Sequence, residues 1–238
     1  MKRFIVTLIG LKIWLLLVFA TLFFSNVPVD IETLASAAQP TPTPAADGKN
    51  PRKTSEPYTG DLSIFEDAAR DKNLQIDRVM DILKISEGRS VADIGAGSGW
   101  FSVRAAKRVG PGGQVFAVEI NQEYIDHINQ GAAAEGFKNI KTILGKPDDP
   151  LLLPNSVDVV FILKTYHEIA EPVALMKKVR SALKKGGLVG IIDRNGNGTD
   201  HGLDKNVVVR ELKQAGFALK WEYDFVKPDN MDYFLVFE

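Results

Sequence analysis

Residues 90–101 read SVADIGAGSGWF, and this stretch decides the fold. Its first part, residues 91–94, is a mainly apolar run typical of a buried parallel strand. The glycines that follow permit the positive φ angles of a tight turn and leave the backbone open to a ligand. We expect a helix to begin near Trp100, with Ser98 as its cap. A glycine turn at the carboxyl end of a strand is where open α/β sheets bind nucleotide-like ligands.

The chain after this turn alternates between predicted strands and predicted helices. We expect further strands over residues 114–120, 140–144, 157–163, 188–193, 219–226 and 233–237, and helices over 61–71, 74–83, 101–109, 122–135, 172–183 and 205–215. Alternation of this kind requires a mainly parallel sheet with helices on both faces. The last two strands are joined by a short loop without a helix and must pair antiparallel. The sequence therefore predicts an α/β fold, a doubly wound, mainly parallel seven-stranded sheet that ends in an antiparallel hairpin.

The first part of the chain has a different character. Two basic residues precede an apolar run over residues 13–24, which has a weaker apolar lead-in from residue 4, and acidic residues follow. This order predicts a protein that is exported or anchored in a membrane through residues 4–24. A small-residue cleavage site, Ala-Ser-Ala, stands at residues 35–37. Residues 1–37 are therefore predicted to be either a cleaved signal peptide or a membrane anchor.

Composition sets the remaining boundaries and excludes several functions. Residues 38–57 are rich in Pro, Ala and Thr, which predicts an extended linker before a folded domain at residues 58–238. Lys and Arg number 29 against 30 Asp and Glu, so no strongly basic surface indicates nucleic acid as a partner. The 238 residues contain no cysteine, which excludes disulfides, thiolate metal sites and cysteine nucleophiles.

The glycine turn differs from a dinucleotide-binding motif. It reads G-x-G-x-G, and the bulky Trp100 stands where a bound pyrophosphate would need a small residue. Asp93 precedes the first glycine, and a carboxylate there repels a pyrophosphate but attracts an ammonium group. Glu119 ends the second strand, where a carboxylate accepts hydrogen bonds from ribose hydroxyls. The combination indicates a ligand with a ribose and an amino group but no phosphates.

Residues 91–99, together with Glu119, closely resemble the class I S-adenosylmethionine-dependent methyltransferases. The turns that enter the fourth and fifth strands are also similar to this family, at residues 154–160 and 183–187, and so is the terminal hairpin. The resemblance covers roughly residues 74–238. It implies a Rossmann-like methyltransferase fold, methyltransferase activity and S-adenosylmethionine as the cofactor.

The resemblance also implies roles for the residues of the turn. The backbone would line the methionine part of the cofactor, at Gly95, Ala96, Gly97 and Gly99. Asp93 would lie near the ammonium group of that part.

Further roles follow from the resemblance for the second and third strands. Glu119 would hold the ribose, and Ile120 would pack on the adenine. The family often has an acidic residue after the third strand that accepts from the adenine amino group. Lys146 stands at that position here, and Asp148 or Asp149 is expected to substitute.

A candidate general base follows the fourth strand. His167 lies just past the end of that strand, Glu168 is able to orient it, and Tyr166 could position a substrate. The alternative is that His167 caps the following helix or packs in the loop. This segment and the loop that holds His201 also resemble a bacterial group of predicted small-molecule methyltransferases.

No residue is assigned as a metal ligand, and one alternative stays open. Residues 193–199 read DRNGNGT and match the start of a calcium-binding loop, with Asp204 at its twelfth position. A strand rather than a helix precedes the motif, so a mobile loop on the substrate side is the favoured interpretation.

We therefore predict transfer of a methyl group from S-adenosylmethionine to an O, N or C nucleophile of a small molecule. The sulfonium is already activated, so alignment supplies much of the acceleration. The alternative is a catalytically silent, exported module that binds another ligand on the same fold. This alternative arises because S-adenosylmethionine is made in the cytosol, whereas the N-terminal residues predict export.

Overall fold

The computed structural model describes residues 52–55, 58, 60–67, 69–227 and 231–238. The predicted signal peptide or anchor and most of the predicted linker lie outside the described residues. Within the described part of the chain, every helix is too short or too polar to cross a membrane.

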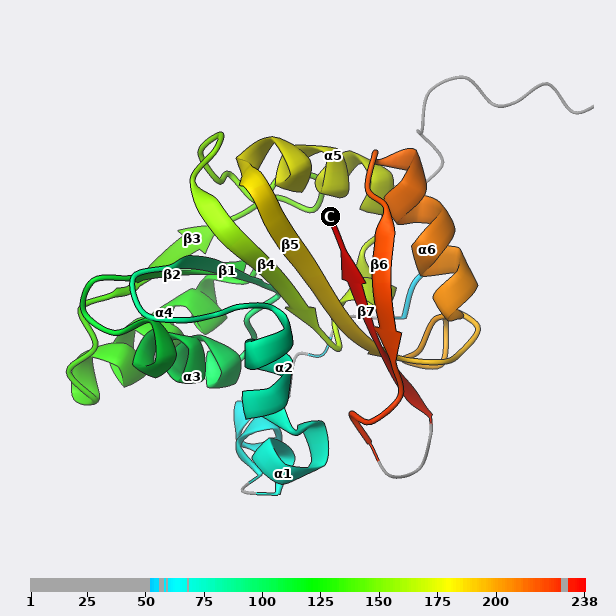
Figure 1. Ribbon diagram of the computed structural model, residues 1–238. Coiled ribbons are helices and arrows are strands. Elements are labelled where there is room, and N and C mark those ends of the chain that lie inside the picture. The colour runs from blue at the N-terminus through cyan, green and yellow to red at the C-terminus, as the bar shows by residue number, and fades with distance from the viewer. Residues whose placement is uncertain (1–51, 56–57, 59, 68, 228–230) are drawn as a thin grey trace, which may run out of the picture. The chain divides into compact units, whose positions relative to one another are not determined.

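Seven strands form one mixed sheet in the order β3-β2-β1-β4-β5-β7-β6 (Figure 1). They span Ser90–Ile94 (β1), Gln114–Glu119 (β2), Ile140–Leu144 (β3), Val157–Leu163 (β4), Leu183–Arg194 (β5), Leu219–Tyr223 (β6) and Asp232–Phe237 (β7). Strands β1 to β5 pair in parallel, and β7 runs antiparallel to both β5 and β6. The predicted doubly wound sheet with a terminal antiparallel hairpin is confirmed.

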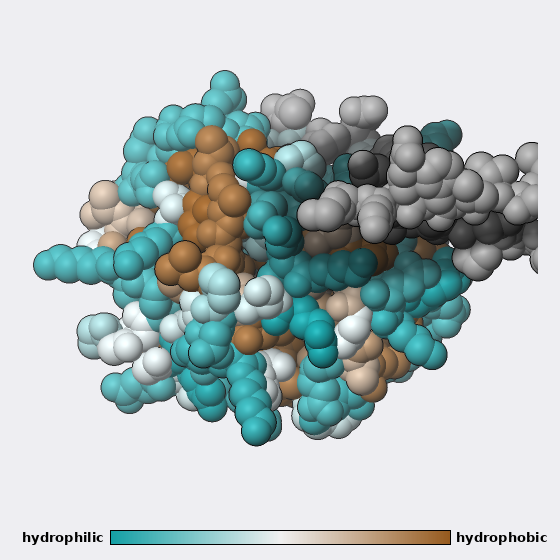
Figure 2. Space-filling view, turned by 90° about the horizontal axis from the view of Figure 1, so that it is seen from above, coloured by the Kyte–Doolittle hydropathy of each residue, from teal (hydrophilic) through white to brown (hydrophobic). Residues whose placement is uncertain are grey.

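Helices cover both faces of this sheet. They span Arg70–Leu74 (α1), Ile76–Ile82 (α2), Trp100–Val109 (α3), Gln122–Ala134 (α4), Pro172–Ala182 (α5) and Lys205–Gln214 (α6), and two 3-10 turns span Leu62–Glu66 (η2) and Tyr166–Glu168 (η3). Helices α2, α3 and α4 lie on one side of the sheet, and α5 and α6 lie on the other (Figure 1). Seen from above, a band of hydrophobic residues lies among mainly hydrophilic ones (Figure 2).

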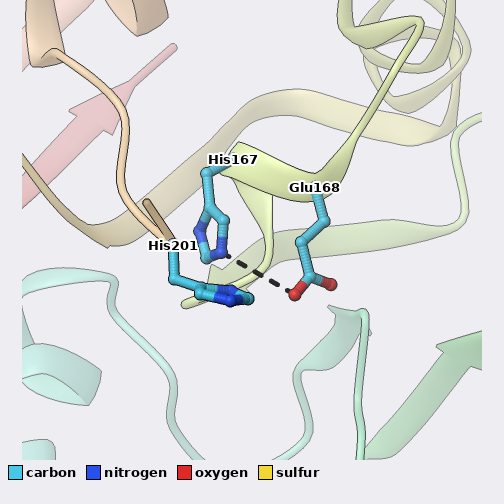
Figure 3. Close-up of side chains that lie close together, drawn as sticks. All are labelled: His167, Glu168 and His201. Atoms are coloured by element: carbon cyan, nitrogen blue, oxygen red, sulfur yellow. Dashed lines mark ion pairs between the residues drawn. The ribbon is translucent and has the colours of Figure 1, made fainter. Parts of the chain in front are cut away.

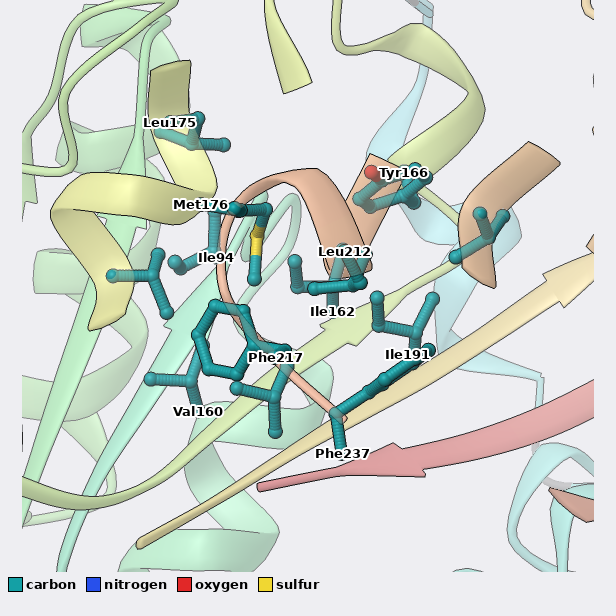
Figure 4. Packing of buried hydrophobic residues seen from close by; sticks show 14 of the residues in the cluster. Ile94, Val160, Ile162, Tyr166, Leu175, Met176, Ile191, Leu212, Phe217 and Phe237 are labelled. Carbon is teal, nitrogen blue, oxygen red and sulfur yellow. The ribbon is translucent and has the colours of Figure 1, made fainter. Parts of the chain in front are cut away.

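Two hydrophobic clusters hold the helices to the sheet. On one face Met176 of α5 and Leu212 of α6 pack near Ile162 of β4 (Figure 4). On the other face Phe101 of α3 packs on Phe161, with ring centroids 4.3 Å apart. Neighbouring residues of β4 therefore enter opposite cores, because side chains alternate along a strand. This explains the unbroken apolar run of that strand.

Two local details differ from what the sequence predicts. The described residues before β1 form three short helical segments rather than two helices, and Gln75, with a φ of +47°, separates α1 from α2. Ser98 is not the cap of α3. Gly99 occupies that position with a φ of +82°, and the buried Ser98 hydroxyl has no hydrogen-bond partner within the described residues.

The strand order reverses at β1 and creates a crevice. Strand β1 pairs with β2 on one side and with β4 on the other, so the carboxyl ends of these three strands lie next to one another. The helix after β1 covers one face of the sheet, whereas the helix after β4 covers the other (Figure 1). Open α/β sheets bind ligands outside such a reversal point.

Candidate active site

A cavity of about 570 Å³ opens at the carboxyl ends of β1, β2 and β4. Its walls come from the glycine turn, the end of β2, the loop after β4 and the segment before β1. Among the residues predicted to bind the cofactor, those that line the cavity are Asp93, Gly95, Ala96, Gly97, Glu119 and Ile120. One side of the predicted site is therefore assembled in the structure.

The glycine turn brings bare backbone to the cavity. Gly95 has a φ of +70°, and a Cβ on it would lie 2.3 Å from Cγ2 of Thr165, so the loop after β4 sits directly against the turn. Gly97 has a φ of +55°, but apart from its neighbours in the chain no atom of the described residues lies within 4 Å of the position a Cβ would take. A ligand can therefore approach the backbone at Gly97, which a side chain would obstruct.

Glu119 joins the turn to the end of β2. Its Oε2 accepts a hydrogen bond from the Gly97 N–H at 3.0 Å, and its Oε1 accepts one from the Ile120 N–H at 2.8 Å. A carboxylate has about four acceptor positions, so both oxygens can accept further bonds from a ligand. Ile120 is 54% exposed and lines the cavity, so it presents an apolar surface beside this carboxylate.

Asp93 is the most buried acid of the cavity wall, at 1% exposure. Its Oδ2 accepts a hydrogen bond from the Ser102 hydroxyl at 2.8 Å. Burial raises the pKa of Asp93, the Ser102 hydrogen bond lowers it, the negative Glu119 raises it and the nearby Arg70 charge lowers it, and together they bring the pKa to about 7. The carboxyl group therefore changes charge near neutral pH, and a cationic group bound in the cavity would favour its ionised form.

We expect the affinity for S-adenosylhomocysteine to rise about tenfold between pH 6 and pH 8. Asp93 with a pKa of about 7 is mostly protonated at pH 6, so binding an ammonium group there must first release a proton. At pH 8 the carboxylate is already ionised. Calorimetric titration at several pH values measures this dependence.

The Asp93→Asn variant tests the assignment of that pH dependence. Its affinity for S-adenosylhomocysteine should be weaker than that of the wild type at pH 8 and should not change between pH 6 and pH 8. Glu168 also has a pKa of about 7, because burial raises it, so Glu168→Gln is the matched control and should keep the rise. A rise that persists in Asp93→Asn contradicts the assignment.

Two predicted cofactor residues do not line the cavity. Gly99 caps α3, and a Cβ on it would meet Ile128 of α4 at 3.1 Å, which makes its role one of close packing. Asp148 is exposed in the loop after β3, whereas its neighbours Lys146 and Pro147 do line the cavity. The role of Asp148 toward an adenine amino group stays a prediction.

The segment before β1 supplies a wall that sequence reasoning missed. Arg70 of α1 lines the cavity, and its guanidinium lies over the Trp100 ring, 4.4 Å from the centroid. Burial lowers the pKa of Arg70, while Asp93 and Glu66 favour its charged form. Tyr58 also lines the cavity. No motif marks these residues in the sequence, because their place depends on how the segment folds back over the turn.

His167 is held by a partner that sequence reasoning did not assign to it. Its Nδ1 lies 2.9 Å from Oδ1 of Asp193, and its backbone N–H donates to Oδ2 of Asp193 at 2.9 Å. Asp193 is fully buried at the end of β5 and also accepts from the Arg194 N–H. Because the carboxylate accepts from Nδ1–H, Nε2 of His167 carries the free lone pair. His167 is thus an oriented imidazole, as a general base requires.

Two predicted roles beside His167 need correction. Glu168 does not orient the ring by holding Nδ1, because Asp193 does so. Glu168 instead lines the cavity, with its Oε1 3.7 Å from Nε2 of His167. Tyr166 is fully buried and its hydroxyl donates to Glu211 of α6, so it points into the core rather than into the cavity. Tyr166 is therefore not placed to position a substrate in the cavity.

At the end of β5 and in the loop after it, the expected first and twelfth calcium ligands both accept hydrogen bonds from the protein itself. The carboxylate of Asp193, the expected first ligand, is bonded to His167 and Arg194. Asp204, the expected twelfth ligand, accepts from the Asn206 N–H and caps α6. The oxygens of the motif therefore satisfy backbone and side-chain donors of the protein itself.

Comparison with known proteins assigns this chain to a family. A family model described as a methyltransferase domain matches residues 85–223, which is more than half of the chain. The chain is also 29% identical to the demethylmenaquinone methyltransferase of Lactobacillus johnsonii, over 47% of this chain and 46% of the relative. It is 28% identical to the nocamycin O-methyltransferase of Saccharothrix syringae, over 48% of this chain and 41% of the relative. The chain spans less than half the length of these curated relatives.

Solved structures show the same fold. A S-adenosylmethionine-dependent methyltransferase from Aquifex aeolicus superposes with a TM-score of 0.68 at 21% identity, covering 74% of this chain and 95% of that one. Fibrillarin from Aeropyrum pernix, solved with natively bound S-adenosylmethionine, superposes with a TM-score of 0.51 at 18% identity, covering 65% and 68%. The chain therefore belongs to the methyltransferase-domain family, and its fold is that of the class I S-adenosylmethionine-dependent methyltransferases.

Proposed function

We propose that this protein transfers the methyl group of S-adenosylmethionine to an O, N or C nucleophile of a small molecule. One observation carries the proposal. A single cavity joins the Glu119 carboxylate, at the end of β2, to Thr165 and Glu168, in the loop after β4. A cofactor and an acceptor can therefore meet in one enclosed space. The two curated relatives are named a demethylmenaquinone methyltransferase and a nocamycin O-methyltransferase, and these names support a small-molecule acceptor.

The residues present fit the cofactor. The open space at Gly97 accommodates a ligand against the backbone, as a side chain there would not. The Glu119 carboxylate keeps acceptor positions for two ribose hydroxyls. Asp93 lines the same cavity and supplies a negative charge for the ammonium group once it is ionised. The charge and shape of the wall suit an adenosyl ligand that carries an amino group.

The protein contributes alignment and proton removal. When bound, S-adenosylmethionine supplies a methyl group that is already activated by the positive sulfur. The glycine turn and Glu119 fix the position of that ligand, and proximity of this kind accounts for a large part of the acceleration. For an oxygen or nitrogen acceptor, Nε2 of His167 has a free lone pair to take the proton, and Asp193 stabilises the resulting imidazolium.

Titration of the full chain with S-adenosylhomocysteine tests the first part of the proposal. We expect saturable binding in the micromolar range, which is ordinary for enzyme cofactors and substrates. Absence of binding at millimolar ligand overturns the proposal. Binding of NAD without binding of S-adenosylhomocysteine would instead favour a nucleotide-dependent oxidoreductase.

A methyl-transfer screen tests the second part. Labelled S-adenosylmethionine is offered with small phenols, thiols and amines, and transfer to at least one class is expected. His167→Ala should lower turnover about 100-fold, the usual size of general-base effects. His127→Ala is the matched control, because His127 is an exposed residue of α4, and it should leave turnover unchanged. Cofactor binding without transfer to any acceptor would favour the silent binding module.

A further inference from the structure

Glu168 lines the cavity, and two histidines that do not line it lie next to this residue, so that the three side chains form a cluster of metal-ligand type. One ligand atom each of His167, Glu168 and His201 lies within 4.8 Å of the other two. Figure 3 shows the His167 ring and the Glu168 carboxylate converging, with the His201 ring beside them. The residues come from two loops, one after β4 and one after β5, and the ring centroids of the two histidines are 5.9 Å apart.

The free nitrogen of His167 points into this cluster without a partner. His167 is 3% exposed, and its Nε2 makes no hydrogen bond to any described residue. Oε1 of Glu168 lies 3.7 Å from this nitrogen, which is beyond hydrogen-bond distance. Because Nδ1 donates to Asp193, Nε2 and the carboxylate oxygen are both acceptors that face each other. Two acceptors in this position can share a cation, either a proton or a metal ion.

His167 has the hydrogen-bond partner that metal-binding histidines usually have. A ligating imidazole usually donates its other N–H to a carboxylate, which fixes the ring and makes the free nitrogen more basic. Asp193 plays this part, because its buried carboxylate holds both Nδ1 and the backbone N–H of His167. A general base also benefits from such a partner, so a metal site additionally requires Glu168 and His201.

His201 is held near the cluster at a conformational cost. It adopts a φ of +55°, which is uncommon for a residue other than glycine. Its backbone N–H donates to the hydroxyl of Ser55 at 2.9 Å. Arg52 ties the same N-terminal segment to the loop of His167, because its guanidinium donates to the carbonyl oxygens of Tyr166 and Ile169. Residues 52–55 thereby link the two loops that supply the ligands.

We propose that His167, Glu168 and His201 bind a divalent transition-metal ion, tested here with Zn²⁺, beside the cofactor cavity. Two imidazoles and one carboxylate that leave a position open are a donor set of catalytic zinc sites. Calcium and magnesium prefer oxygen donors throughout. Ligands at about 2.1 Å from zinc lie roughly 3.4 Å apart, so the ligand atoms, which lie within 4.8 Å of one another, must approach by up to about 1.4 Å, and the exposed His201 side chain is free to make this movement.

The role of the ion rests on the proposed function, whereas its binding does not. A hydroxyl or thiol of the methyl acceptor could bind the ion at the coordination position that the three side chains leave open. It would then lose its proton to water more readily, because the metal cation stabilises the alkoxide or thiolate that forms. The new bond from this oxygen or sulfur to the methyl carbon forms as the bond from carbon to the sulfonium sulfur breaks, and the sulfur keeps the electron pair. Nε2 of His167 would then bind the ion instead of taking the proton. This role restricts the methyl acceptor to small molecules that have a hydroxyl or thiol able to bind the ion.

Metal analysis of the full chain tests the binding. The protein is treated with chelator, dialysed, loaded with Zn²⁺ and analysed for metal by emission spectroscopy, and Co²⁺ is used in parallel for its visible absorption. We expect one ion per chain in the wild type. His201→Ala should weaken metal binding at least about 100-fold, while its affinity for S-adenosylhomocysteine stays unchanged. His201 is exposed, so this variant is expected to fold.

The third histidine of the sequence provides the matched control, since His127→Ala should bind the ion as the wild type does. Equal binding by His201→Ala and the wild type overturns the proposal, as does the absence of a bound ion in the wild type. If no ion binds but S-adenosylhomocysteine does, the metal site is wrong and the proposed function stands. If the ion binds but S-adenosylhomocysteine does not, the proposed function is wrong and the metal site stands.

Discussion

Replacing Glu119 with alanine is expected to weaken S-adenosylhomocysteine binding by about 100-fold. In the proposed complex the carboxylate accepts two hydrogen bonds from ribose hydroxyls, and each such bond to a charged group contributes about 1.5 kcal/mol. Together they amount to about 3 kcal/mol, which is roughly a factor of 100 in affinity. The substitution also leaves the N–H groups of Gly97 and Ile120 without their partner, which loosens the turn. Calorimetric titration of the purified variant measures the loss.

Two further variants separate binding from folding. Glu123→Ala removes an exposed acid at the start of α4 and should bind as the wild type does. Glu119→Gln keeps the shape of the side chain without its charge and should lose affinity by about tenfold. Thermal melting of each variant shows whether the fold is intact. An unchanged dissociation constant in a folded Glu119→Ala protein would remove the ribose-binding role.

Replacing Asp193 with asparagine is expected to lower the turnover number about 100-fold while leaving the affinity for S-adenosylhomocysteine within a factor of three. The asparagine amide can donate to Nδ1 of His167, which moves the ring proton to Nε2. Nε2 then has no lone pair, either to take a proton or to bind a metal ion. Asp193 does not line the cavity, so it acts through His167 as a positioning residue. Turnover and cofactor affinity are measured on the same preparation.

A second aspartate serves as the control for this variant. Asp158 lies in β4 and accepts from Arg89, Lys184 and the Ser90 N–H, at the opposite end of the sheet from the cavity. Asp158→Asn should lower the melting temperature without a selective loss of turnover. A purely structural role for Asp193 predicts the same pattern for Asp193→Asn, so equal behaviour of the two variants contradicts the positioning role. The pH profile of turnover should also change only in Asp193→Asn.

The alternation of strands and helices was predictable because each element carries its own pattern. The β-branched run of β4 predicts a strand buried on both faces, and the structure confirms it. The terminal hairpin follows from the lack of a helix between β6 and β7, since parallel pairing needs a long crossover. The breaks before β1 were not predictable in the same way. A left-handed residue such as Gln75 is imposed by packing rather than by local preference.

The cofactor half of the site was visible in the sequence for a similar reason. The glycines of the turn, Asp93 and Glu119 each stand at the end of an identifiable strand, and parallel strands bring their carboxyl ends to one edge. The acceptor half was only partly visible. His167 was found from its place after β4, but the direction of each neighbouring side chain depends on partners far away in the chain. Tyr166 points to Glu211, for example.

The sequence alone determined the sheet, the turn and the carboxylate at the end of β2, because short-range patterns and the rules of parallel pairing are enough to place them. Only the tertiary structure decided that Asp193 holds His167, that His201 lies beside Glu168 and that Arg70 closes the cavity. These relations join residues separated by many positions, and they arise from the register of β4 against β5 and from the path of loops between elements. Loop paths are set by long-range contacts such as those of Arg52 and Ser55, which leave no periodic signal in the sequence.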